Sequence, residues 1–245
     1  MIKIKNIIYL GYQNFKSIYA DSKIGILWSP IGFLILLIVK VIIFSSFFHS
    51  DRSLYIAYIS IGLINWILFN LSINRFIFIF KNNTFLLNTN IKTTDLLKIY
   101  FTETLFIFLL NLIPVVIIVF YCGYYSLLFL ISIIFVIFYY FELTKLVSLL
   151  GIYFNDFGHL IKSSLFCMYF LTPIFWLNNN LIESYYYLFV LNPLFLIINI
   201  QRSFLGINQF NSLDIYFFIF HFFILIILNY FVFNKSHNKI KNYIL

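Results

Sequence analysis

Six long apolar runs fill most of this sequence of 245 residues, and they constrain its fold more than any other feature. A helix that rises ~1.5 Å per residue crosses the ~30 Å hydrocarbon core of a bilayer in about 20 residues. Most of the runs approach or exceed this length, and the fifth reaches it with the help of Ile161–Ser164. The sequence therefore predicts an all-α polytopic membrane protein with six transmembrane helices. The runs are Ile26–Phe48, Leu54–Phe80, Leu105–Tyr121, Leu127–Leu150, Leu165–Leu177 and Ile215–Phe233.

The composition leaves little room for a soluble domain. Hydrophobic residues make up 63% of the chain and charged residues 10%, far from the balance of soluble proteins. The longest stretch outside the runs is Asn178–Asp214. We therefore expect one membrane domain over residues 1–245, with an interface helix over 1–23, six spans over 24–233 and a cytoplasmic tail over 234–245.

The basic residues fall mainly on one side of the predicted spans. If the N-terminus is cytoplasmic, eleven of the sixteen Lys and Arg residues lie on inner segments, and Arg52 and Arg202 lie on outer ones. Cytoplasmic loops carry such an excess of positive charge, so we expect both termini to be cytoplasmic. The formal net charge of +8 then faces anionic lipid, and nucleic acid is not an expected partner.

Residues 1–19 have the periodicity of a helix that lies on a membrane surface. At 100° per residue, the apolar side chains fall within an arc of about 140°, and polar ones take the other face. The pattern predicts an amphipathic helix in the inner interface. The apolar face consists of Ile4, Ile7, Ile8, Gly11, Tyr12, Phe15, Ile18 and Tyr19.

The segment Tyr187–Ile200 is apolar but too short to cross, and Pro193 interrupts it. A crossing here would also place the basic C-terminal end outside, against the charge rule. We therefore expect outer re-entrant helices between the fifth and sixth spans.

Several polar residues lie at membrane depth. A charge facing lipid costs ~2.5–3.5 kcal/mol or more, so Lys40 should face protein or an aqueous path. Glu142 and Lys145 are spaced to pair on one helix face, either for structure or for function. Arg75 is close enough to the inner surface to snorkel, and His221 is expected to be hydrogen-bonded within the packing.

Motifs for catalysis or nucleotide binding are missing from the sequence. It contains no Gly-x-x-x-x-Gly-Lys-Ser/Thr, His-Glu-x-x-His, Cys-x-x-Cys or Asp-x-Asp pattern. We expect no catalytic, cofactor or metal site in this chain.

Five segments resemble the ABC-2-type polysaccharide export permeases. Together they extend over roughly residues 15–206, in the order that the family shows. Two positions depart from the family pattern. Pro30 comes early after Trp28, and Asn155 stands where the family usually has an Arg. Any role that this Arg has in the family is therefore not expected of this chain. The segments are Ser22–Trp28, Gly62–Trp66, Asn155–Leu160, Leu171–Trp176, and Asn192–Pro193 with Arg202–Gly206.

The resemblance implies a homodimer of six-span subunits in the bacterial inner membrane, with two copies of a cytoplasmic ABC ATPase that binds the ATP. The cargo would be a lipid-linked polysaccharide of the O-antigen type, exported during lipopolysaccharide biosynthesis. ABC-2 permeases for capsular polysaccharide, teichoic acid, lipids or drugs are the alternatives within this class. A membrane glycosyltransferase is less favoured because acidic motifs are missing, and a purely structural assembly protein would leave Lys40 without a purpose.

The resemblance also indicates which residues the cargo would meet. Phosphate head groups need cationic partners, and sugars stack on aromatic faces. We expect Lys23 to assist near the inner mouth and Arg202 near the outer one, with interfacial anchoring as the alternative for Lys23 and the tryptophans. The cargo-path candidates are Lys23, Trp28, Lys40, Trp176 and Arg202.

The inner loop over residues 81–99 is the candidate docking site for the ATPase, because the family carries a coupling helix there. Thr93 or Thr94 can cap a short helix that continues to Lys98. A solvated connector is the alternative. The docking candidates are Phe85, Leu86, Ile91 and Asp95.

The topology can be tested with single cysteines at Ser50, Asn179 and Ser236 in a background without Cys122 and Cys167. An impermeant thiol reagent added outside should label the first two positions and leave the third unlabelled, because only the third is cytoplasmic. Labelling at Ser236, or none at Asn179, would contradict the six-span arrangement.

Overall fold

The computed structural model describes residues 3–45, 51–83, 91–153, 156–177 and 179–244, with the side chains of 179 and 233–244 left aside. Within these ranges the secondary structure is helical, without strands. Five helices are long and apolar enough to cross a membrane, as expected of a polytopic membrane protein. They are α2 (Trp28–Phe44) with the 3₁₀ turn Gly25–Leu27 before it, α3 (Arg52–Asn74), α6 (Thr93–Tyr121), α7 (Leu127–Tyr153) and α12 (Ser212–Ile244).

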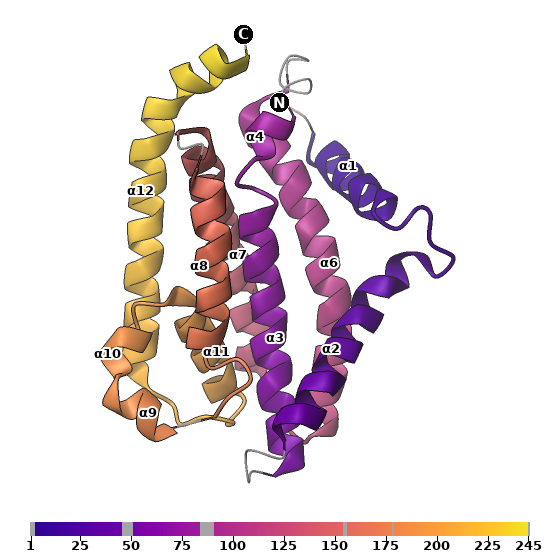
Figure 1. Ribbon diagram of the computed structural model, residues 1–245, viewed down its shortest axis with the longest axis vertical. Coiled ribbons are helices and arrows are strands. Elements are labelled where there is room, and N and C mark those ends of the chain that lie inside the picture. Colours follow the sequence, from indigo (N-terminus) through magenta and orange to yellow (C-terminus); the bar gives the residue numbers. More distant parts are fainter. Residues whose placement is uncertain (1–2, 46–50, 84–90, 154–155, 178, 245) are drawn as a thin grey trace.

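The helices form a bundle around α3. This helix is buried along most of its length and packs against α2, α6, α7, α11 (Pro193–Phe204) and α8 (Phe157–Leu171). Figure 1 shows that α12 ends at the upper end of the molecule, where α1 (Ile4–Ser17) and α4 (Ile79–Asn82) also lie. The short helices α9 (Asn179–Ser184) and α10 (Tyr186–Phe189) lie in the lower half with α11.

The helix predicted near the N-terminus is confirmed as α1. Ile7, Gly11 and Phe15 are buried on one side of it, against α6. A side chain at Gly11 would meet Thr102 Cβ at 2.7 Å, so the two helices approach closely here. Ile4, at 76% exposure, and Ile8 remain exposed, and their placement in a membrane interface stays a prediction.

Several predicted boundaries were wrong. The second run was expected to continue to Phe80, but α3 ends at Asn74, where the chain turns Phe76 and Ile77 into the core. The third helix begins at Thr93 rather than Leu105, so the expected short helix after Thr93 is the first part of α6. The apolar part of α12, Ser212–Val232, agrees with the sixth run, and the helix continues through the predicted tail to Ile244, whose cytoplasmic location stays a prediction.

The fifth apolar run contains the helix α8, which ends at Leu171 rather than Leu177. Pro173 explains the end, because a proline disfavours helical geometry at the residue before it. Thr172 accordingly has extended backbone angles, with φ −84° and ψ 134°. The described chain then continues without a long helix to α11, where Pro193 occupies the first turn and Asn192 caps it.

Gly151 of α7 marks a very close approach between two elements of the core. A Cβ placed there would lie 1.7 Å from the carbonyl oxygen of Ile77, which belongs to the turn after α3. We expect Gly151→Ala to lower the free energy of unfolding by about 1–3 kcal/mol, because overpacking forces the backbone apart. Thermal unfolding of the detergent-purified protein measures this.

Gly32→Ala is the matched control, because Gly32 also lies within a helix but has nothing within 4 Å of its Cβ position. It should be neutral or stabilising, since alanine has the higher helix propensity. Equal melting temperatures for the two variants would show that the contact with Ile77 is unimportant.

Candidate functional site

A non-helical segment, Thr172–Trp176, lies between α8 and α9 inside the bundle. Thr172, Ile174 and Phe175 are buried, and Trp176 is half-buried. A non-helical backbone at membrane depth must have its polar groups satisfied by other parts of the protein, because lipid offers no hydrogen bonds. The partners of these carbonyl groups therefore decide whether the segment can exist.

Two tyrosines of α3 and one arginine of α11 supply these partners. The hydroxyl of Tyr55 donates to Phe175 O at 2.6 Å. The hydroxyl of Tyr58 lies 3.2 Å from Pro173 O and 3.1 Å from Trp176 O. Arg202 donates from Nη1 to Pro173 O at 2.7 Å and from Nη2 to Ile174 O at 3.1 Å. Four consecutive carbonyl groups are thus hydrogen-bonded by side chains from two other helices.

Arg202 is built into this arrangement and is 1% exposed. Its Nε and Nη2 also donate to Tyr58 O, at 3.2 and 2.8 Å, and its guanidinium carbon lies 3.2 Å from the centre of the Tyr58 ring. Gly62 leaves room for it, since a Cβ there would lie 2.8 Å from Nη2. The sequence predicted a cargo contact for Arg202, whereas its position and bonds favour a role in holding the non-helical Thr172–Trp176 segment.

The short helices of the lower half are tied to the same region. Asn192 caps α11 and donates from Nδ2 to Thr172 Oγ1 at 2.7 Å. Asp214 at the start of α12 accepts from Tyr186 Oη and from Asn199 Nδ2, both at 2.6 Å. Burial and the bond to Asp214 raise the pKa of Tyr186, so its hydroxyl remains a donor. His221 Nε2 contacts Val190 O at 3.1 Å, in line with the packing role expected of it.

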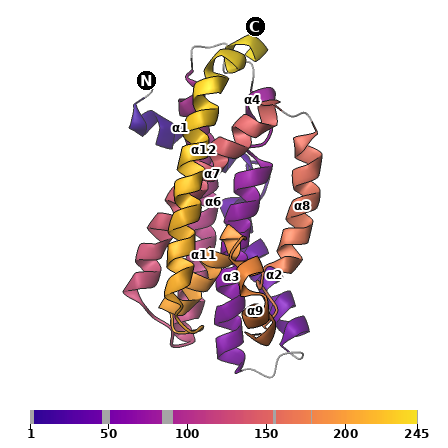
Figure 2. The same ribbon diagram turned by 90° about the vertical axis from the view of Figure 1, so that its left-hand side faces the viewer.

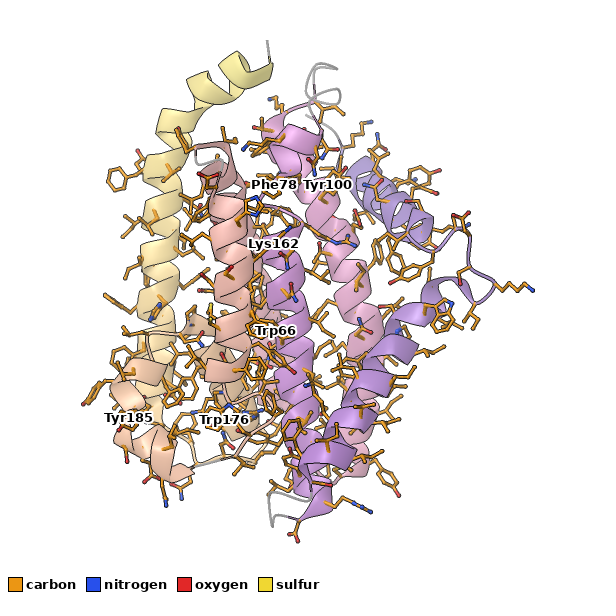
Figure 3. The ribbon with its side chains drawn as sticks, in the orientation of Figure 1. Trp66, Phe78, Tyr100, Lys162, Trp176 and Tyr185 are labelled. Atoms are coloured by element: carbon orange, nitrogen blue, oxygen red, sulfur yellow. The ribbon has the colours of Figure 1, made fainter. Side chains whose placement is uncertain are left out.

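A groove of about 850 Å³ lies between α2, α3 and α8. Among the described residues that line it, two are lysines, Lys40 and Lys162, and none is Asp or Glu. The remaining wall is mostly aliphatic on α2, apart from Phe44, whereas α3 and α8 add aromatic and amide-bearing side chains among aliphatic ones. Figure 3 shows Lys162, Trp66 and Trp176 following one another from the upper towards the lower half of the molecule. The polar and aromatic lining residues are Lys40, Phe44, Trp66, Asn70, Asn74, Lys162, Phe166 and Tyr169.

Lys40 is held among aromatic rings in the groove. Its Nζ lies 4.8 Å from the ring centre of Phe175, 4.9 Å from Tyr169 and 5.9 Å from Phe44. Such rings attract a cation electrostatically and compensate part of its lost hydration. Trp66 extends the aromatic cluster, with its ring centre 4.8 Å from that of Tyr169. The expectation that Lys40 faces protein is therefore met on this side of α2.

The other cargo-path candidates are not gathered in this groove. Lys23 and Trp28 are exposed near the start of α2. Trp176 donates from its indole nitrogen to Phe170 O at 2.9 Å and packs against Phe189, so its side chain is engaged beside the non-helical segment and away from the groove. These positions leave the predicted contacts of Lys23, Trp28 and Trp176 with cargo as predictions.

The sequence reasoning missed three groove residues: Trp66, Lys162 and Tyr169. The sequence did contain a pattern for the two on α8. The groove residues of this helix fall at positions i, i+3, i+4 and i+7 from Lys162 to Tyr169, which places them on one face. The same spacing also describes ordinary helix packing. The spacing therefore indicates a groove only when the positions of the neighbouring helices are known.

Of the four docking candidates, Phe85 and Leu86 lie outside the described residues. Ile91 is half-buried and packs against the core. Asp95 is 2% exposed, so the structure places it inside this subunit rather than on a docking surface.

Two ion pairs explain other charges within the helices. Arg75 pairs with Glu103 of α6, so it is held within the protein and does not simply reach towards the surface as the sequence predicted. Lys145 pairs with Glu142 on α7, as the spacing predicted.

Searches with protein-family models and against curated proteins found no match to this chain.

Substitution of Arg202 tests whether its hydrogen bonds to the Thr172–Trp176 segment stabilise the fold. Arg202→Ala and Arg202→Lys should both lower the free energy of unfolding by at least about 3 kcal/mol, because several buried carbonyls lose a charged donor. Lysine cannot restore the planar fork of the guanidinium group. Membrane abundance and thermal unfolding measure the effect, with Lys162→Ala as the exposed control, expected within about 0.5 kcal/mol. Normal stability of Arg202→Ala would contradict this role.

Proposed function

We propose that this chain is the transmembrane subunit of an ATP-driven exporter of a lipid-linked polysaccharide, and that the groove between α2, α3 and α8 forms part of the cargo path. The observation that carries the proposal is the chemistry of the groove. Lysines without neighbouring carboxylates among the lining residues suit a phosphate or pyrophosphate group. Aromatic faces and amides suit sugar rings, and the aliphatic wall of α2 suits a lipid chain.

The spatial meeting of the family-like segments supports the proposal. Gly62 packs against Ile174 and Arg202, and Asn192 bonds Thr172. Trp66 packs against Tyr169, just before the segment Leu171–Trp176. Three of the five segments that resemble the family, although far apart in the sequence, thus form a single contact region.

The proposed topology has six crossings. Besides the five long helices, α8 supplies about 22 Å over its 15 residues. We propose that the non-helical residues Thr172–Trp176 complete this crossing of the ~30 Å of hydrocarbon. We propose that α9, α10 and α11 re-enter from the far side, with both termini cytoplasmic and the protein in the bacterial inner membrane.

The proposed assembly contains two copies of this chain and two copies of a cytoplasmic ABC ATPase. The groove is open, and α2 and α8 carry exposed apolar residues beside it, such as Ile42 at 69% exposure and Phe166 at 69%. A second copy could cover these faces and close the path. Since the sequence has no P-loop, ATP binding is assigned to the partner subunit.

Substitution of Lys40 tests the proposed path. In cells that lack the native copy, Lys40→Gln should lower surface polysaccharide about tenfold or more at normal membrane abundance, because a charge-assisted contact of ~1.5–3 kcal/mol is lost. Lys40→Arg should retain part of the export, and the exposed Lys5→Gln should match the unaltered protein. Sugar analysis of the cell surface and immunoblotting of membranes measure the two quantities.

Two results would count against the proposal. Unchanged surface polysaccharide after deletion of the gene would exclude polysaccharide export. Loss of resistance to an apolar drug in the same cells would favour the drug or lipid permease instead. Purification with a co-encoded ATPase at equal stoichiometry would support either permease and exclude the glycosyltransferase.

A further inference from the structure

Helix α8 forms one wall of the groove, and Figure 2 shows it at one edge of the molecule. Of its 15 residues, all of which the structure describes, Gly158 and Leu165 are buried. In α3, which forms the neighbouring wall, the buried residues extend from Tyr55 to Ile73. A helix with so little buried surface is held by a few contacts, and those at its two ends decide its tilt.

The lower end of α8 is fixed by hydrogen bonds. The helix continues directly into the Thr172–Trp176 segment, whose carbonyl groups accept from Arg202 and Tyr55. The hydroxyl of Thr172 also accepts from Asn192 Nδ2. This end is therefore a fixed point about which the rest of the helix can tilt.

The upper end of α8 rests on the ring of Phe78, the residue just before α4. A Cβ built on Gly158 would lie 2.7 Å from Cε2 and 3.0 Å from Cε1 of this ring, and closer still to Cζ at its tip. The ring thus occupies a space that exists only because residue 158 has no side chain. Figure 3 shows Phe78 above Lys162, on the way from the groove to the upper end of the molecule.

The spacing along α8 decides which groove residue this contact controls. From Thr172, the axial distance is about 21 Å to Gly158, about 15 Å to Lys162 and about 5 Å to Tyr169. A tilt about the lower end therefore moves Lys162 by roughly 0.7 of the displacement at Gly158, and Tyr169 by roughly 0.2. Lys40, whose ammonium group faces the ring of Tyr169, stays close to the fixed point.

We propose that Phe78 is a positioning residue for the groove. Its ring, packed on Gly158, sets the tilt of α8 and with it the distance between Lys162 and Lys40. Without the ring, the upper part of α8 tilts while Lys40 keeps its place. The inference concerns the groove itself, and its structural part does not depend on the cargo that we propose for it.

Pulsed electron paramagnetic resonance on the purified full chain in nanodiscs tests the inference. Cys122 and Cys167 are first replaced by serine. One spin label is then attached to Leu109→Cys on α6, and the other to either Ser163→Cys or Leu171→Cys on α8. All three label positions are exposed and lie outside the groove lining.

Phe78→Ala should shift or broaden the distances from Ser163→Cys by about 2 Å, the size of helix shifts at packed interfaces. Distances from Leu171→Cys should stay the same, because that residue lies beside the fixed point. Gly158→Ala keeps the ring but fills its space, so it should produce the same difference, and it serves as the test if Phe78→Ala does not fold. The matched control is Phe223→Ala, which removes an exposed ring of α12 and should change neither distance.

Unchanged distances from Ser163→Cys in both variants would overturn the positioning role. Equal changes at the two ends of α8 would also overturn it, because the helix would then move as a whole.

Export by intact cells gives a second measurement, and it alone rests on the proposed function. Phe78→Ala should lower surface polysaccharide about tenfold at normal membrane abundance, because a charge-assisted contact of Lys162 is displaced. Normal export by this variant, in a strain that exports nothing when the gene is deleted, would overturn the positioning role. If deletion of the gene leaves surface polysaccharide unchanged, the proposed function fails, and the distances alone decide the inference.

Discussion

The fold depends on the hydrogen bonding of the backbone between Thr172 and Trp176. These residues are non-helical in the interior of an apolar bundle, where no water is at hand to satisfy their carbonyl groups. Arg202, Tyr55 and Tyr58 satisfy them, and in doing so they join α3, α11 and the end of α8. The most buried cation among the described residues is therefore a substitute for the hydrogen bonds that a regular helix makes within itself.

The same bonds organise the groove. Tyr55 holds the carbonyl of Phe175, and the ring of Phe175 faces Lys40 at 4.8 Å. Phe175 also packs against Tyr169, with ring centres 5.5 Å apart. The lysine is thus positioned by side chains whose own backbone is fixed from α3 and α11. A binding site supported by packed aromatic rings loses little conformational freedom when a ligand enters.

Hydropathy was sufficient to predict the helical class and the positions of five long helices, because the lipid core sets both their length and their composition. Helix ends were harder to predict from hydropathy. Phe76 and Ile77 are apolar like most of the run before them, yet the chain turns there and Ile77 packs closely against Gly151. The role of Arg202 could not be predicted either. Its acceptors lie 28, 29 and 144 residues away, and no local pattern reports such distances.

These long separations impose an order on biogenesis. Arg202 is synthesised 28 residues after Ile174, a delay of a few seconds at about 5–20 residues per second. During that interval the Thr172–Trp176 segment lacks its main hydrogen-bond donor. Its carbonyl groups can be satisfied within the protein only when α11 follows. The packing of the Thr172–Trp176 segment is therefore completed only once α11, which follows it in the chain, has been made.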